Sequence, residues 1–157
     1  MNLYLVRHGD AVSDLRDPSR PLSERGRAEL QTLAQCLAPH VDAASIVHSG
    51  KTRAEQSAQI LQTVALPNAA LTMRKGLNPN DDVESLAQEV QHEHGDLVVV
   101  GHLPYVARLT SLLVCGDAER STFMFDTGTC VSLQRSGSTW CVRWMLDPHL
   151  LLSRKGD

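Results

Sequence analysis

Three short apolar segments of this chain are each followed, directly or after a short turn, by a histidine or an arginine. They are residues 3–6, 45–47 and 97–100. The first is followed by Arg7-His8-Gly9, the second leads through a small-residue turn to Arg53, and the third ends in Gly101-His102. Short apolar runs bounded by turn residues are typical of buried strands. Ligands of open α/β sheets bind at the carboxyl ends of the strands, so we expect these basic and imidazole groups to converge on one pocket.

The rest of the sequence alternates between strand-like and helix-like patterns. Apolar runs predict strands over residues 2–6, 44–49, 71–73 and 97–100. A 3.6-residue period predicts helices over 24–38, 52–64, 83–92 and 103–113, the first of them capped by Ser23. Residues 130–134 and 139–145 flank a glycine-containing turn and predict a β-hairpin. The expected fold is a three-layer α/β structure, with a mostly parallel sheet, helices on both faces and a C-terminal antiparallel hairpin at the sheet edge.

Length and composition predict one soluble domain. The chain has 157 residues, of which 42% are hydrophobic and 21% charged, which is ordinary for one globular domain spanning 1–157. We expect the tail from about residue 147 to be loose. The net charge of -3 without a basic block argues against nucleic-acid binding. No apolar run reaches the roughly 18–20 residues of a membrane span, and the chain begins directly with a strand, so we expect a cytoplasmic location and no membrane partner.

The cysteines and the paired histidines do not form a metal-binding pattern. None of the four cysteines is in Cys-x-x-Cys spacing, and in a cytoplasmic chain we expect them to be reduced. His92 and His94 are separated by one residue, but no further ligands lie at the spacing of a structural zinc site. We expect no metal and no cofactor.

Three motifs resemble those of the histidine phosphatase superfamily, the phosphoglycerate-mutase-like group. They are Arg7-His8-Gly9, the segment from Ser49 through Arg53-Ala54-Glu55-Gln56-Ser57, and Gly101-His102. Pro21-Leu22-Ser23-x-x-Gly26 resembles the start of a helix in that family, and the whole match spans residues 2 to about 110 in the family's order. The sequence around Arg20-Pro21-Leu22 and His102-Leu103-Pro104 is most similar to that of the SixA-type phosphohistidine phosphatases.

This resemblance implies metal-free phosphoryl transfer. His8 would be the nucleophile, attacking phosphorus through one neutral ring nitrogen while the other donates a hydrogen bond to a carbonyl. Arg7 and Arg53 would hold the phosphoryl oxygens, because the planar guanidinium matches phosphate. His102, expected to be protonated, would be a further donor. These protein cations would then supply the positive charge that a metal ion supplies elsewhere.

Four more residues are candidates for contacting the substrate. They are Gly9, Asp10, Arg20 and Ser49. Gly9 is expected to allow a positive φ and the close approach of a ligand. Asp10 either orients His8 or water, or caps its own loop. Arg20 either reaches the pocket or stays in solvent, and Ser49 either binds phosphate or opens the next helix.

The chain lacks the general acid that the mutases and many phosphomonoesterases of this superfamily carry. No glutamate stands at the expected spacing in residues 75–84, and Leu103 rather than an acid follows His102. Asp81 or Asp82 could replace that glutamate, which the sequence leaves open. A general acid is worth about 10²–10⁴-fold in rate. An alcohol leaving group depends on this acid more than an imidazole does, so the sequence favours P–N over P–O substrates.

The leading hypothesis is therefore a metal-independent phosphatase that acts on phosphohistidine through a covalent intermediate. The resemblance implies a phosphorylated protein as its partner, such as a histidine-phosphotransfer domain. One alternative is a phosphomonoesterase of the same superfamily that acts on small molecules, phosphoserine or phosphothreonine. A second is a non-catalytic phosphate-binding module. The oligomeric state is left open by the sequence.

Overall fold

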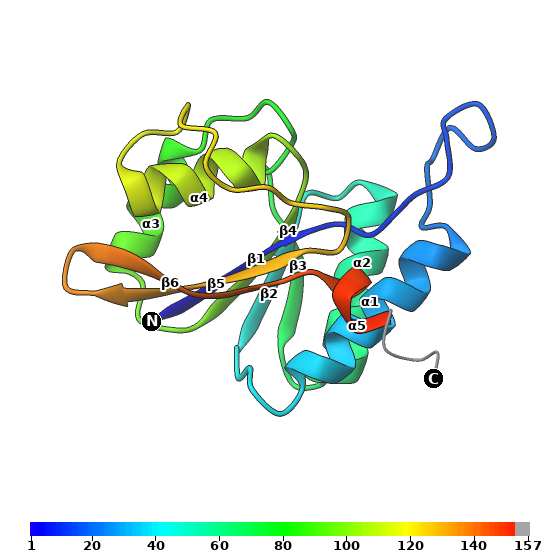
Figure 1. The fold of residues 1–157 in the computed structure, drawn as a ribbon, viewed down its shortest axis with the longest axis horizontal. Coiled ribbons are helices and arrows are strands. Elements are labelled where there is room, and N and C mark those ends of the chain that lie inside the picture. The colour runs from blue at the N-terminus through cyan, green and yellow to red at the C-terminus, as the bar shows by residue number, and fades with distance from the viewer. Residues whose placement is uncertain (153–157) are drawn as a thin grey trace.

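The computed structural model describes residues 1–152 of the chain, which form a six-stranded sheet with helices on both faces (Figure 1). The strands are β1 Asn2–Arg7, β2 Ser45–His48, β3 Ala70–Met73, β4 Leu97–Gly101, β5 Cys130–Ser136 and β6 Thr139–Leu146. They lie in the order β3-β2-β4-β1-β5-β6. The first four pair in parallel, whereas β5 and β6 are antiparallel. The predicted α/β fold with an antiparallel hairpin at one edge is confirmed.

Helices cover the two faces of this sheet in separate groups. Their bounds are α1 Glu24–Leu37, α2 Thr52–Ala65, α3 Glu84–His92, α4 Tyr105–Cys115 and α5 Pro148–Leu152. The first two and α5 lie on one face, and α3 and α4 lie on the other (Figure 1). The sequence placed the start of α4 two residues too early, because Leu103 and Pro104 form the turn before it and Pro104 is its N-cap.

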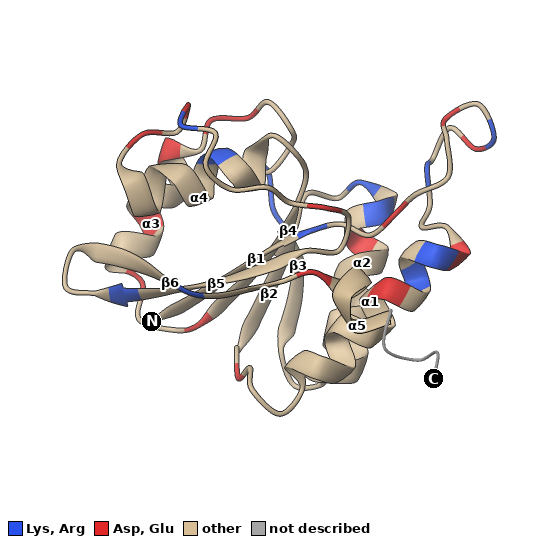
Figure 2. Ribbon diagram, viewed as in Figure 1, with Lys and Arg blue, Asp and Glu red and all other residues tan. Residues whose placement is uncertain are grey.

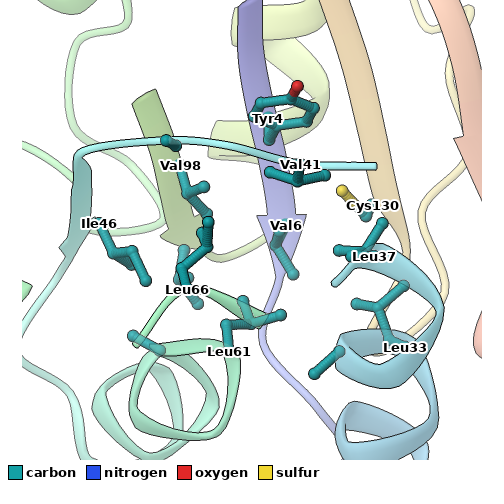
Figure 3. Packing of buried hydrophobic residues seen from close by; sticks show 14 of the residues in the cluster. Tyr4, Val6, Leu33, Leu37, Val41, Ile46, Leu61, Leu66, Val98 and Cys130 are labelled. Atoms are coloured by element: carbon teal, nitrogen blue, oxygen red, sulfur yellow. The ribbon is translucent and has the colours of Figure 1, made fainter. Parts of the chain in front are cut away.

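The central strand β4 is buried on both faces. Val98 and Val100 belong to the apolar cluster under α1 and α2, whereas Val99 belongs to the cluster under α3 and α4. Figure 3 shows the first cluster, in which leucines of α1 and α2 pack against Val6 and Val98 of the sheet. A slip of one residue in a strand would turn its side chains to the opposite face, so these two clusters fix the strand register.

Helix α1 is held tightly against the end of β1. Ser23 caps it by accepting a hydrogen bond from the amide of Gly26 at 3.0 Å, as the sequence predicts. A side chain at Gly26 would collide with the backbone of Asp10, so glycine lets the chain that follows β1 cross the helix closely. The first turn of α1 therefore supports the segment that carries His8.

The predicted loose tail is wrong as far as residue 152. Residues 148–152 form α5, which packs against α1 with Pro148 buried. The His149 Nδ1 atom lies 3.4 Å from the Glu29 Oε1 atom on α1. This anchoring has no periodic signal in so short a segment. Residues 153–157 lie outside the described part of the chain.

Two further findings concern the chain as a whole. Within residues 1–152, no helix is long and apolar enough to cross a membrane. The four cysteines, which all lie in this range, are not joined by disulfides.

We predict that Gly26→Ala destabilises the protein although alanine favours helices. The added methyl group would meet the Asp10 backbone, and overpacking of this kind costs about 1–3 kcal/mol. Urea denaturation should show a lower free energy of unfolding. Gly95→Ala is the matched control, because its methyl group would meet nothing within 4 Å. An equal or higher stability of Gly26→Ala would contradict this packing account.

Candidate active site

The strand register brings the two histidines of the predicted site together. Arg7 pairs with Gly101 at the carboxyl ends of β1 and β4, so the next residues on the two strands, His8 and His102, are neighbours. Their ring centroids are 4.9 Å apart. Figure 2 shows basic residues at the end of β1 and the start of α2 on this same side of the sheet. The predicted convergence of Arg7, His8, Arg53 and His102 is what the structure shows.

His8 is buried and held in one tautomer. Its Nδ1 atom lies 2.7 Å from the carbonyl oxygen of Gly9, so Nδ1 carries the proton and donates it there. Its Nε2 atom accepts a hydrogen bond from Arg53 Nε at 3.1 Å. Burial, followed by the nearby guanidinium groups, lowers the pKa of His8 to about 4 despite the opposing Gly9 hydrogen bond. The imidazole is therefore neutral at physiological pH, as a nucleophile must be.

His102 differs from its sequence-based expectation. It is buried, its Nε2 atom lies 2.6 Å from the Ser49 hydroxyl oxygen, and its Nδ1 atom has no hydrogen-bond partner among the described residues. Burial, then His8 and Arg53, lower its pKa to about 3. The expectation that His102 carries a proton is thus wrong for the ligand-free protein. Sequence reasoning missed this because desolvation is a property of the assembled site.

Ser49 lies in the site, next to His102. Its hydroxyl pairs with His102, whereas the N-cap position of α2 belongs to Lys51, which makes no side-chain capping bond. The Ser49 hydroxyl also accepts from the amide of Lys51, the N-cap residue of α2, at 3.4 Å, so it contacts both the site and the start of the helix. Its hydrogen bond orients the His102 ring.

Arg7 is fixed by a loop to which sequence reasoning assigned no role. Its Nη1 atom donates to the carbonyl oxygen of Phe125 at 2.7 Å, and its buried Nε atom has no partner in the described part of the chain. The amide of Gly128 donates to the carbonyl oxygens of Arg7 and His8, each at 3.1 Å. Gly128 has a φ of 78°, so a glycine just before β5 was the available signal.

Arg53 is anchored through the helix that carries it. It lies in the first turn of α2, and burial followed by the nearby Arg20 lowers its pKa. The Ser57 hydroxyl donates to the Arg53 carbonyl oxygen at 2.7 Å and accepts from the amide of Gly9 at 3.1 Å. Ser57 therefore joins α2 to the end of β1. The sequence motif contained Ser57 but did not show this role.

Gly9 is a glycine for a different reason than predicted. Its φ is not positive, and its amide is occupied by Ser57. A side chain here would come within 2.5 Å of Leu30 on α1. The glycine therefore lets helix α1 approach, and the expected close approach of a ligand to its backbone is not supported.

Asp10 supports the start of helix α1. Its two carboxylate oxygens accept from the Ser23 hydroxyl at 2.6 Å and pair with the Arg25 guanidinium at 2.7 Å. These partners hold its pKa below the ordinary value, although burial acts in the opposite direction. These contacts fit the alternative in which Asp10 supports its own loop, and a role for Asp10 toward His8 or the substrate stays a prediction.

Arg20 stands near the pocket in an unusual backbone conformation. Its φ is 48°, and its Nε atom donates to the Val12 carbonyl oxygen at 3.4 Å. Its charge contributes to the lowered pKa values of both His8 and His102. Of the two readings from sequence, the structure favours the one in which Arg20 reaches the pocket.

The two aspartates that could replace the missing acid are used within their own loop. Asp81 Oδ2 accepts from the amide and side chain of Asn78, at 2.7 and 3.0 Å. Asp82 Oδ1 accepts from the amide of Glu84 at the start of α3. A third carboxylate, Asp126, lies close enough to Arg7 to raise its pKa, although burial has the larger effect and lowers it. Across residues 1–152, no group of three His, Cys, Asp or Glu side chains could hold a metal ion.

Comparison with known proteins agrees with this geometry. The family model described as histidine phosphatase superfamily (branch 1) matches residues 3–78. The solved structure of the protein histidine phosphatase SixA in complex with tungstate is 26% identical, with a TM-score of 0.85 over 96% of this chain and 99% of that one. Residues 3–78 of the chain are therefore similar to the histidine phosphatase superfamily. The resemblance stated from the sequence is thereby confirmed.

Other solved structures share the fold at lower identity. SixA from Agrobacterium tumefaciens is 23% identical, with a TM-score of 0.77 over 94% of this chain and 97% of that one. The alpha-ribazole phosphatase from Shigella flexneri is 16% identical, with a TM-score of 0.74 over the same shares, 94% and 97%. A search of curated proteins finds no match. Since these structures carry different activities on one fold, the fold supports a phosphatase and leaves its substrate to the site.

We predict that both site histidines stay neutral until the pH falls well below their ordinary value of 6.5, His8 to about 4 and His102 to about 3. In this range the unfolded chain binds protons that the folded protein does not, so stability should fall as the pH drops below 6.5. NMR titration of ¹⁵N-histidine-labelled protein would report the tautomer and pKa of each ring. Adding tungstate should raise the pKa of His102, because an anion offsets the neighbouring cations. A ligand-free His102 that titrates near its ordinary value would contradict this.

Proposed function

We propose that this protein hydrolyses phosphohistidine on a partner protein through a covalent phosphohistidine intermediate at His8, without a metal ion. The observation that carries this proposal is the hydrogen bonding of His8. Nδ1 donates to Gly9, so the ring lone pair is on Nε2, where it accepts a hydrogen bond from Arg53 Nε in the ligand-free protein. The similarity to the SixA structure supports the same chemistry.

In the first step, His8 Nε2 attacks phosphorus. The bond from phosphorus to the substrate's imidazole nitrogen breaks as the new Nε2–P bond forms. Arg53 Nε occupies Nε2 in the ligand-free protein, and on substrate binding it would instead donate to a phosphoryl oxygen. The proton stays on Nδ1 and is donated to Gly9 O, and this carbonyl oxygen stabilises the positive ring of the phosphorylated His8.

The second step returns the enzyme to its starting state. Water attacks the phosphorus, the Nε2–P bond breaks, and inorganic phosphate leaves. Buried donors without partners, Arg7 Nε and His102 Nδ1, would bind phosphoryl oxygens in both steps. A bound dianion would raise the pKa of His102 and so turn a neutral ring into a charged donor. Fixed donors of this kind stabilise the charge that develops in the transition state.

The surroundings of the pocket favour an imidazole leaving group. Asp10, Asp81 and Asp82 all have their carboxylates engaged in local hydrogen bonds or ion pairs. Phosphohistidine is labile, and its leaving ring can take a proton from solvent, so it needs an enzymatic acid less than an alkyl phosphate does. The engaged aspartates therefore support P–N over P–O hydrolysis.

A phosphomonoesterase is the second candidate, because of one further carboxylate. Asp126 is exposed and lies near Arg7, where it could protonate an alkoxide leaving group. The alpha-ribazole phosphatase with the same fold supports this alternative in general terms.

We expect the protein to turn over a phosphohistidine protein and aryl phosphates much faster than alkyl phosphates. Asp81→Asn, Asp82→Asn and Asp126→Asn should each change phosphohistidine turnover by less than about tenfold, below the ~10²–10⁴-fold value of a general acid. Activity should survive excess chelator, because protein cations supply the charge. The assay is a substrate panel with kcat and KM for each variant.

The panel also separates the two candidates. Good turnover of alkyl phosphates together with a loss of about a hundredfold or more in one aspartate variant would favour the phosphomonoesterase. Loss of activity in chelator with recovery on adding zinc or magnesium would reject the metal-free mechanism.

A further inference from the structure

The segment between β1 and α1 projects from the body beside the active site (Figure 1). We call residues 11–22 the arm. Its base is closed by the bridge between Ala11 and Leu22 and by the hydrogen bond from Val12 N to Pro21 O at 2.9 Å. The amide of Leu22 donates to Gln56 Oε1 at 2.8 Å, on the helix that carries Arg53. The base of the arm is therefore fixed to the catalytic framework.

Local hydrogen bonds also give the outer half of the arm a defined shape. Asp17 Oδ1 accepts from the amide and hydroxyl of Ser19, at 2.9 and 2.7 Å, and the amide of Arg20 donates to the Asp17 carbonyl oxygen. Near the tip, the side chain of Leu15 is 96% exposed. A preorganised loop that presents an apolar side chain loses little conformational entropy when a partner covers it.

Three other exposed apolar residues adjoin residues of the site. Each adjoins a residue or turn of the site, since Leu103 follows His102, Met124 precedes Phe125, whose carbonyl binds Arg7, and the Met73 side chain lies against Gly50. With Leu15, they make four of the seven exposed large apolar residues in the described part of the chain. The other three, Val142, Met145 and Leu150, lie on β6 and α5.

We infer that Leu15 and Met124 belong to a docking surface for a folded protein that presents its phosphohistidine beside exposed apolar side chains. This inference rests on the proposed function. Once a phosphoryl group is bound at His8, the body of a protein substrate must lie over the rim of the pocket. Single exposed apolar residues are ordinary, but four of the seven in the described part of the chain lie on the arm or adjoin residues of the site.

Arg20 couples this arm to the pocket. It lies at the base of the arm in a left-handed conformation that costs a residue with a side chain about 1–2 kcal/mol. Strain of this size persists only where the surrounding structure enforces it, and it is frequent at binding sites. The Arg20 charge helps to lower the pKa values of His8, Arg53 and His102. The arm therefore contributes Arg20 to the phosphate site and Leu15 to the proposed docking surface.

The test compares hydrolysis of the same P–N bond in a phosphorylated protein and in free phosphohistidine. Histidine-phosphotransfer domains phosphorylated with phosphoramidate are the protein substrates, and free phosphohistidine is the small one. Leu15→Ser and Met124→Ser should each lower kcat/KM on the domains by about tenfold, the size expected when one large apolar contact is lost, mainly through KM. On free phosphohistidine they should match the wild type. Leu150→Ser is the control, because Leu150 is 68% exposed but lies on α5, and it should leave both reactions unchanged.

The outcomes separate the inference from the proposed function. Hydrolysis of both substrates with no effect of Leu15→Ser or Met124→Ser would overturn the docking surface and leave the phosphatase activity standing. Hydrolysis of free phosphohistidine but of none of the domains would also overturn it. Equal losses on both substrates would place these residues in the pocket chemistry instead. No hydrolysis of either substrate by the wild type would reject the proposed function itself.

Discussion

The parallel pairing of β4 with β1 is the constraint on which the site depends. It sets Arg7 opposite Gly101, and so places His8 and His102 side by side. The pairing of β2 with β4 brings His48 opposite Val100, and with it Ser49 into reach of His102. Valines packed on both faces of β4 hold this register. The active site is thus a direct consequence of how the core is packed.

Burial and crowded positive charge then determine the chemistry. Burial has the largest effect in lowering the pKa of His8, and Arg53, Arg7 and Arg20 add to it, so the ring stays neutral and nucleophilic. Arg20 also repels Arg53, and among residues 1–152 none of these three arginines forms an ion pair. A tetrahedral oxyanion relieves this repulsion, which explains why one arrangement can both keep the nucleophile neutral and bind its target.

The sequence predicted the elements with strong patterns and the residues at their ends. The four central site residues could be found because they lie at the ends of apolar strands or at the start of the helix that follows, in recognisable motifs. The neutral state of His102 could not be predicted from the sequence, since its desolvation arises only when the helices and the sheet pack around it. The Phe125–Gly128 loop has no periodic pattern, and α5 is too short to have one. Gly9 and Asp10 were predicted to contact substrate, but their contacts in the structure are with α1 and its start, which sequence spacing does not show.

The central claim is that His8 carries the phosphoryl group during turnover. The most direct measurement is rapid quenching of the wild type during hydrolysis of a radiolabelled phosphohistidine protein, followed by mapping of the label. We predict acid-labile, base-stable phosphate on His8, and a His8→Ala variant that folds normally but neither turns over substrate nor retains label. Label on a serine, threonine, aspartate or cysteine, or full activity of His8→Ala, would contradict the account. Binding of phosphate without label or turnover would instead indicate a non-catalytic phosphate-binding module.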